Sequence, residues 1–137
     1  MKQSTLIENI LSKDNLNNAY LQVVRNKGAA GVDGMEYKAL LSHLRKNGEQ
    51  IKESIRNQTY KPMPVKRVEI PKEDGSKRKL GIPTVTDRTI QQAVAQVLTP
   101  IYEEKFHDNS YGFRPQKSAQ QAVLKAVEYM NEECNWI

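Results

Sequence analysis

Basic side chains gather in one part of this 137-residue sequence. Residues 56–79 hold eight Lys and Arg residues against three Asp and Glu residues, so this window accounts for the whole net charge of +5. The cations are Arg56, Lys61, Lys66, Arg67, Lys72, Lys77, Arg78 and Lys79. A basic stripe on an otherwise neutral domain is typical of proteins that bind nucleic acid or nucleotide phosphates. A solvated, solubilising face is the alternative interpretation.

The other reactive side chains do not have the spacing of a catalytic or metal centre. Three aspartates stand singly at predicted turn or helix-cap positions, where carboxylates usually bind backbone N–H groups: Asp33, Asp87 and Asp108. Cys134 lies far from His43 and His107, and no phosphate-binding G-x-x-x-x-G-K-[ST] loop occurs. We therefore predict a phosphate-binding α+β domain with no catalytic residue and no metal ligand of its own.

Helical periodicity predicts the elements of residues 1–59. A capping-box pattern at Thr5–Glu8 starts a short helix, and residues 15–25 form a second that ends at residues 26–28. Apolar residues from Tyr37 onward mark a third helix, which Gly48 is expected to close, and a further short helix covers residues 51–55.

The period changes at Lys66 from helical to alternating, which predicts a β-hairpin over residues 66–82 with its tip at Glu73–Ser76. Both arms beside the tip are basic. Like charges that face each other across a ladder are unfavourable, so an anionic partner would offset them. An exposed edge hairpin in which lysine blocks aggregation is the alternative.

The rest of the sequence predicts helices again. The first covers residues 87–98, Thr99-Pro100 is expected to bend the chain and start a short helix to Lys105, and Ser118–Gln121 forms a capping box for the last helix. An apolar segment then begins at residues 135–137, which we interpret as the start of a buried strand and hence as a sign of a fragment. No apolar run is long enough to cross a membrane and no secretion signal is evident, so we expect the cytoplasm.

Three motifs resemble one known family. The stretch RVEIPKEDGSKRKLGIPT at residues 67–84, with Asp-Arg at 87–88 and Gln-Gln-Ala at 91–93, is similar to the first conserved block of bacterial group II intron reverse transcriptases. SYGFRP at residues 110–115 is similar to their second block, and KGAAGVDG at residues 27–34 to their N-terminal extension. The departures are small: Lys79 stands where members often carry proline, and Ser76 where many carry glycine.

The resemblance implies roles for particular side chains. Lys72 and Arg78 match the basic residues of the fingers hairpin that hold the triphosphate of the incoming nucleotide, a role that suits a point charge and a planar fork. The residues implied to contact the template or other nucleic acid are Arg88, Arg114, Lys66, Lys79, Lys61, Lys27 and Phe113. Arg88 and Arg114 have an alternative role as partners of helix caps, and Phe113 as a core aromatic.

The resemblance also implies a fold class and a function. Residues 1–59 would be a helical N-terminal extension of the fingers, and residues 60–137 the β-hairpin fingers and the first part of the palm of a right-hand polymerase, cut before its catalytic strands. The parent protein would be an RNA-directed DNA polymerase and intron-splicing maturase that uses Mg²⁺, a DNA primer, dNTP, template RNA and intron RNA. The fragment alone would be inactive. The competing interpretations are a noncatalytic basic RNA-binding module and a homodimer formed through an exposed apolar face.

Overall fold

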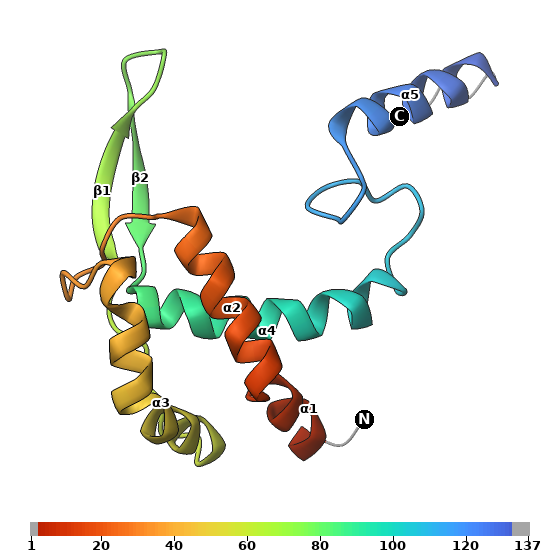
Figure 1. The fold of residues 1–137 in the computed structure, drawn as a ribbon. Helices are drawn as coiled ribbons and strands as arrows, with labels where there is room; N and C mark the ends of the chain where they lie inside the picture. The colour runs from red at the N-terminus through yellow and green to blue at the C-terminus, as the bar shows by residue number, and fades with distance from the viewer. Residues whose placement is uncertain (1–2, 133–137) are drawn as a thin grey trace. The chain divides into compact units, whose positions relative to one another are not determined.

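The computed structural model describes residues 3–132 and divides the chain into two compact units, Met1–Leu98 and Thr99–Ile137. Helices and one antiparallel two-stranded sheet make up the described part (Figure 1). The elements are α1 Gln3–Ile10, α2 Lys13–Asn26, the 3₁₀ helix η1 Tyr37–Ala39, α3 Leu40–Arg56, β1 Lys66–Pro71, β2 Lys77–Ile82, α4 Val85–Glu103 and α5 Ala119–Asn131. The predicted α+β composition is confirmed. None of the described helices is both long enough and apolar enough to cross a membrane.

The first helices differ from the prediction at their ends. Thr5 lies inside α1, so it does not cap that helix. Ser12 caps α2 by accepting a hydrogen bond from the Asn15 backbone N–H, and Lys27 closes it in the left-handed conformation at φ 48°. Because a left-handed residue at this position satisfies the last carbonyls, Lys27 closes the helix within the end predicted at residues 26–28.

Gly48 does not end the third helix, which was predicted to stop there. Helix α3 continues to Arg56 and includes the residues assigned to a separate short helix. Leu40, Leu44, Ile51 and Ile55 follow one stripe along the helix across the glycine. A glycine inside a helix costs only about 1 kcal/mol relative to alanine, so a continuous apolar stripe can offset it.

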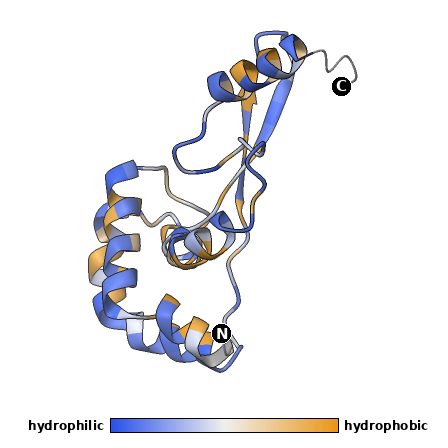
Figure 2. Cartoon of the chain, turned by 90° about the vertical axis from the view of Figure 1, so that its right-hand side faces the viewer, coloured by the Kyte–Doolittle hydropathy of each residue, from blue (hydrophilic) through white to orange (hydrophobic). Residues whose placement is uncertain are grey.

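A small core holds the first unit together. Val23 of α2, Leu40 of α3 and Val85 of α4 are buried against one another. Five partly buried side chains pack around them: Tyr20, Val24, Met35, Tyr37 and Leu44. Figure 2 shows hydrophobic and hydrophilic residues mixed along each helix, as expected for helices that bury only one stripe. The core therefore joins three helices that are distant in sequence.

The predicted hairpin is confirmed. Strands β1 and β2 pair antiparallel with Lys66 opposite Ile82 and Pro71 opposite Lys77. Gly75 turns the chain at φ 81°, and the Asp74 carboxylate accepts hydrogen bonds from the backbone N–H and the hydroxyl of Ser76 at 2.9 and 2.6 Å. The hairpin projects from the helices of its unit (Figure 1), and all its strand residues are exposed except two half-buried ones.

Helix α4 runs through Pro100 to Glu103, so the predicted bend and restart at residues 99–100 are wrong. The proline removes the hydrogen bond that its nitrogen would donate to the Gln96 carbonyl. Half-buried Val94, Val97 and Ile101 nevertheless share one helical stripe on both sides of it. We infer that burial of this stripe stabilises the helix enough for it to continue past the proline.

In the second unit, the capping box of α5 is confirmed. Ser118 and Gln121 exchange the two reciprocal side-chain to backbone hydrogen bonds. No residue of α5 is buried, and its exposed apolar side chains are Val123, Leu124, Val127, Tyr129 and Met130. The predicted apolar segment at residues 135–137 and Cys134 lie outside the described residues.

Candidate nucleic-acid interface

The register of the hairpin decides which of its cations share a face. Arg78 lies opposite Ile70, and such directly opposite residues point to the same side of a sheet. The Lys72 backbone N–H donates to the Ser76 carbonyl at 2.8 Å, which extends the same register beyond Pro71. Lys72 is two positions after Ile70, so alternation puts Lys72 and Arg78 on one face of the hairpin. Alternation alone could not have settled this from the sequence.

The opposite face of the hairpin is partly neutralised. Glu69 lies directly opposite Lys79, and its carboxylate also forms an ion pair with the Lys77 ammonium at 3.0 Å. Arg67 faces Gly81. No two cations are directly opposite in the ladder, so the expected repulsion between like charges across the strands is wrong, and it gives no reason for an anionic partner. On the other face, Lys66 and Arg78 lie opposite Ile82 and Ile70, so the ladder gives neither of them an acidic partner.

A buried carboxylate fixes the base of the hairpin on helix α4. Asp87 is 3% exposed, and its side chain accepts hydrogen bonds from the Tyr60 hydroxyl, from the Met63 backbone N–H at 3.0 Å and from the Thr84 hydroxyl at 2.8 Å. Thr84 in turn accepts from the Asp87 backbone N–H at 3.1 Å. Burial and the neighbouring carboxylate raise the pKa of Tyr60. Segments before β1 and after β2 are thus held at one helix end.

The glycine loop at residues 28–34 packs against the same helix end. A Cβ at Gly31 would lie 2.7 Å from the Thr84 Cα, a distance that no real side chain shows. At Gly28 a Cβ would overlap the Arg88 guanidinium, which donates a hydrogen bond to the Ala29 carbonyl. The loop therefore needs glycine at Gly31, where the close neighbour is backbone, whereas at Gly28 the close neighbour is the end of a flexible side chain.

Arg114 lies in the second unit, where it is used internally. Its guanidinium donates to both oxygens of Glu103 at 2.8 to 3.2 Å and to the carbonyls of His107 and Ser110, each at 2.8 Å. The side chain is 8% exposed and lies 5.4 Å from the Phe106 ring centre. The hydrogen bond from Arg114 lowers the pKa of the Glu103 carboxyl. These contacts correspond to the alternative role of a structural partner.

Phe113 is presented outward by the loop that Arg114 holds. Its ring is fully exposed, and its backbone takes the left-handed conformation at φ 56°. Such a backbone costs a non-glycine residue on the order of 1 kcal/mol, which the carbonyl contacts of Arg114 can offset. The nearby Tyr111 ring lies 5.2 Å from the Lys117 ammonium. Phe113 is therefore not a core aromatic among the described residues.

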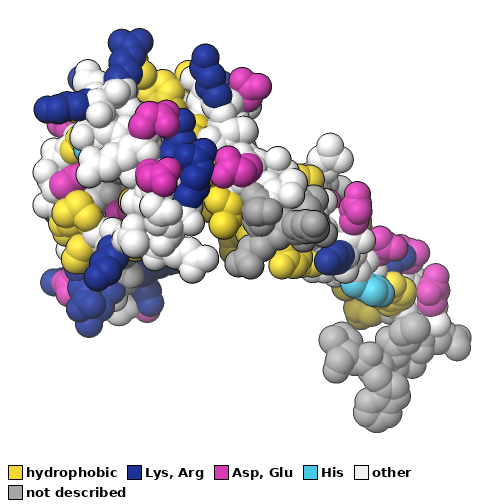
Figure 3. Space-filling model, turned by 90° about the horizontal axis from the view of Figure 1, so that it is seen from below, with side chains coloured by type: hydrophobic (Ala, Val, Ile, Leu, Met, Phe, Trp, Pro, Cys, Tyr) yellow, Lys and Arg dark blue, Asp and Glu magenta, His cyan; other side chains and the backbone are white. Residues whose placement is uncertain are grey.

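The remaining predicted contact residues are exposed cations of the first unit. Lys27 ends α2, Lys61 precedes the hairpin, Lys66 opens β1 and Lys79 lies in β2. The charge of Arg56, which belongs to the same basic window, is neutralised because its guanidinium donates to the Glu8 carboxylate of α1 at 2.9 and 3.2 Å. On the face in Figure 3, basic and acidic side chains are intermixed. The hairpin, rather than the whole window, is the concentrated basic surface.

Comparison with known proteins places these elements in a family. Residues 70–137 match the family model described as Reverse transcriptase (RNA-dependent DNA polymerase). The group II intron-encoded protein LtrA of Lactococcus lactis subsp. cremoris is 41% identical over 111 residues, which cover 80% of this chain and 18% of LtrA. The chain belongs to the group II intron reverse transcriptases.

Other relatives of this reverse transcriptase chain agree. Protein YkfC of Escherichia coli is 38% identical over 111 residues, 80% of this chain and 29% of YkfC. The putative COX1/OXI3 intron 2 protein of Saccharomyces cerevisiae is 34% identical over 96 residues, 70% of this chain and 11% of that protein. The chain thus spans less than a third of the length of the curated relatives it matches.

Reverse transcriptases are divalent-metal enzymes, and polymerases hold a pair of ions on carboxylates. Within residues 3–132 no group of three or more His, Cys, Asp or Glu side chains could hold a metal ion. The described part of this reverse transcriptase chain therefore does not fit the implied Mg²⁺ site, and none of its residues is assigned as a ligand of the ion.

Sequence reasoning missed the partners of Asp87 and the environment of Arg88. Thr84 and Asp87 have the spacing of a Thr-x-x-Asp cap, so that part of the network was detectable. Tyr60 and Met63 lie 27 and 24 residues before Asp87, and no local pattern links them to it.

Proposed function

We propose that this chain forms the fingers and the first part of the palm of a group II intron reverse transcriptase, with the hairpin binding the triphosphate of the incoming nucleotide. The observation that carries the proposal is the common face of Lys72 and Arg78. Both side chains are exposed, and neither takes part in an ion pair among the described residues. Two free cations on one face of a hairpin suit a polyphosphate.

The proposed partners beyond the nucleotide are template RNA, intron RNA and a DNA primer. Exposed Lys27, Lys61, Lys66 and Lys79 would contact phosphates, Arg88 would do so beside the glycine loop, and Phe113 would support a template base. Arg114 would then act through the loop that it holds rather than by direct contact. Contacts of this kind give salt-dependent binding that is nearly independent of sequence. A titration of the chain with RNA at several salt concentrations measures that dependence.

Kinetics of the full-length enzyme test the hairpin. Lys72→Ala and Arg78→Ala should each lower kcat/KM for dNTP roughly ten- to a hundredfold, since a lost charge-assisted contact costs about 1.5–3 kcal/mol. Template-primer affinity, measured by filter binding, should stay nearly unchanged. Arg78→Lys should recover only part of the loss, because an ammonium cannot make a two-pronged contact.

Two hairpin lysines serve as matched controls. Lys66 shares the face of Arg78 but lies at the base of the hairpin, and Lys79 lies on the other face. Lys66→Ala and Lys79→Ala should weaken nucleic-acid binding and leave the KM for dNTP nearly unchanged. If Lys72→Ala and Arg78→Ala reduce template-primer binding as much as catalysis, the hairpin is a template clamp and the triphosphate role is wrong.

Three further elements of the proposal concern the chain by itself. We expect no primer extension from it with Mg²⁺, because two-metal transfer needs clustered carboxylates. Sedimentation tests whether the exposed apolar face of α5 makes a homodimer. The cytoplasmic location stays a prediction.

The reverse transcriptase match does not favour a noncatalytic RNA-binding module, which would need none of the polymerase blocks.

A further inference from the structure

Helix α4 belongs to both compact units of the chain. Its residues 85–98 lie in the first unit and its residues 99–103 in the second, although the helix runs without a break (Figure 1). Pro100 is the second residue after this boundary and stands inside the helix. The proline nitrogen has no hydrogen to donate to the Gln96 carbonyl, and the proline ring crowds that carbonyl. The helix is therefore weakened in the turn where it passes from one unit to the other.

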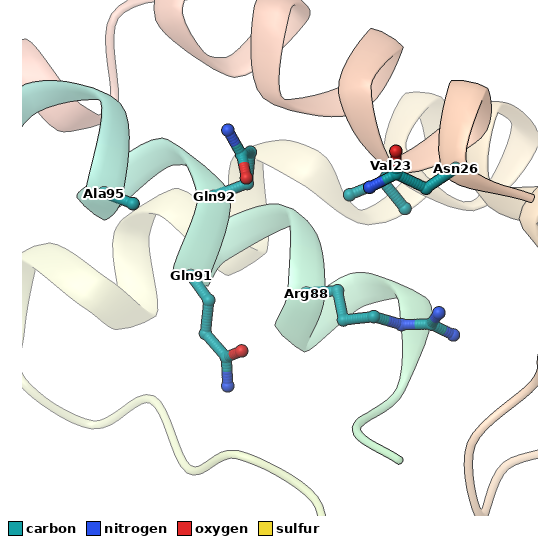
Figure 4. A pocket seen from close by; sticks show the side chains of 6 residues that line it. All are labelled: Val23, Asn26, Arg88, Gln91, Gln92 and Ala95. Carbon is teal, nitrogen blue, oxygen red and sulfur yellow. The ribbon is translucent and has the colours of Figure 1, made fainter. Parts of the chain in front are cut away.

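The part of α4 before this turn is fixed to the first unit. The Gln96 side chain donates hydrogen bonds to the backbone carbonyl and the side-chain oxygen of Asn15 at 3.1 and 2.8 Å. Asn15 in turn donates to the Ala93 carbonyl at 3.0 Å. Nearer its start, α4 faces α2 across an open pocket of about 320 Å³, the Arg88 pocket, which Figure 4 shows and which is lined by Val23, Asn26, Arg88, Gln91, Gln92 and Ala95. Contacts with α2 thus hold α4 as far as Gln96.

The part of α4 after this turn is fixed to the second unit. The Glu103 carboxylate accepts three hydrogen bonds from the Arg114 guanidinium at 2.8 to 3.2 Å. Arg114 also donates to two backbone carbonyls, so it ties the end of α4 to the loop that presents Phe113. Thr99 and Pro100 lie between the two fixed points, and both are exposed.

We propose that the turn from Gln96 to Pro100 is a hinge about which the two compact units change their relative orientation. A hinge needs two rigid attachments and a short segment between them that absorbs the change in backbone angles. Gln96 and Glu103 supply the attachments, and the missing hydrogen bond at Pro100 supplies the weak point. The half-buried stripe through Val97 and Ile101 keeps the turn helical, so the helix bends without unfolding.

The hinge goes beyond the proposed function, and it lies between residues to which that function assigns contacts. The hairpin cations Lys72 and Arg78 belong to the first unit, whereas Phe113 belongs to the second. Bending at Pro100 therefore changes the distance between the hairpin and Phe113. Closure of this kind around a ligand takes microseconds to milliseconds.

Pro100→Ala stiffens the hinge and leaves its surroundings in place. Alanine restores an N–H that can donate to the Gln96 carbonyl, and it removes the ring that crowds this carbonyl. Because Pro100 is exposed, the change removes little packing. Thr99→Ala is the matched control, since it shortens an exposed side chain in the same turn and keeps the proline.

Pulsed electron paramagnetic resonance on the 137-residue chain measures the motion as a distribution of distances between two nitroxide labels. One pair of labelled sites, Gln50→Cys in α3 and Gln120→Cys in α5, reports across the hinge, and a second pair, Asn18→Cys with Gln50→Cys, reports within the first unit. Cys134→Ser removes the native thiol. The distribution across the hinge should be wider than the one within the unit, and Pro100→Ala should reduce its width by roughly half, because a helix with all its hydrogen bonds curves only gently.

The width across the hinge decides the outcome. A narrower distribution in Pro100→Ala supports the hinge, provided that Thr99→Ala matches the wild type and the distances within the first unit are the same in all three chains. There is no hinge if the wild-type distribution is as narrow across the turn as within the unit, or if Pro100→Ala leaves its width unchanged. A shifted mean with unchanged width also refutes the hinge, because the proline then sets a fixed bend. The hairpin variants test the proposed function separately, so either can fail while the other stands.

Discussion

Replacing Asp87 by alanine removes the acceptor that holds both ends of the hairpin on α4. Three donors lose their partner: the Tyr60 hydroxyl, the Met63 N–H and the Thr84 hydroxyl. Hydrogen bonds to a charged group are worth about 1.5–3 kcal/mol each, but the buried charge and its desolvation disappear as well. We expect a net loss of about 3 kcal/mol, which lowers the melting temperature of the first unit by roughly 15 °C.

A double-mutant cycle with Tyr60→Phe tests the network rather than the residue. The single Tyr60→Phe change should cost about 1.5 kcal/mol, because it leaves one carboxylate oxygen without that donor. In the Asp87→Ala background the same change should cost almost nothing, so the two sites should be coupled by at least about 1 kcal/mol. Thermal and urea unfolding give the free energies, and hydrogen exchange at the Met63 amide should accelerate in Asp87→Ala.

Asp74→Ala is the matched control, because that carboxylate is an exposed cap of the hairpin turn. It should change the stability of the unit by no more than about 0.5 kcal/mol. Additive costs for Tyr60→Phe and Asp87→Ala, with unchanged exchange at the Met63 amide, would refute the view that Asp87 joins the hairpin to the helix.

Three other measurements follow from individual contacts. Since the pKa of Tyr60 is raised in the folded chain, its stabilisation is present below the ordinary value near 10 and lost as pH rises further; Tyr60→Phe should therefore flatten the fall in melting temperature above pH 10. The pKa of Glu103 is lowered in the folded chain, so the Arg114 Nε–H should stay protected from exchange at the ordinary glutamate pKa of 4.5 and lose that protection only at lower pH. Glu103→Gln should weaken the protection at every pH, and NMR exchange measurements check both. Gly48→Ala should raise the free energy of unfolding by about 1 kcal/mol in a chemical denaturation series, and a loss of stability would show that α3 needs the glycine.

Local patterns predicted the elements that local forces decide. The hairpin followed from alternation and a turn that only Gly75 can make easily, and the start of α5 from the spacing of Ser118 and Gln121. The helix breakers were overestimated. Gly48 and Pro100 each destabilise their helix by a fixed free energy. Each further turn buries more of the apolar stripe that crosses them, so the helices continue.

The site was harder to predict, because its geometry depends on contacts across long sequence separations. The charge window identified the hairpin, but only the register shows that Lys72 and Arg78 share a face. Arg114 looks like a nucleic-acid ligand in the sequence and is bound by Glu103 in the structure. The Arg88 pocket depends on side chains from two helices, and no spacing within either helix indicates it.

One end of α4 connects the two proposed binding surfaces. Thr84 caps the helix, bonds to the carboxylate that anchors the hairpin base, and lies against Gly31 of the glycine loop. Four residues after Thr84, Arg88 contacts the same loop and lines the pocket. The neighbour of Gly31 is backbone, whereas that of Gly28 is the end of a flexible side chain, so the loop lies closest to the rigid part of the fold at Gly31. A strand bound by Arg88 would therefore take its position relative to the hairpin base from Thr84, which contacts both the carboxylate at that base and Gly31.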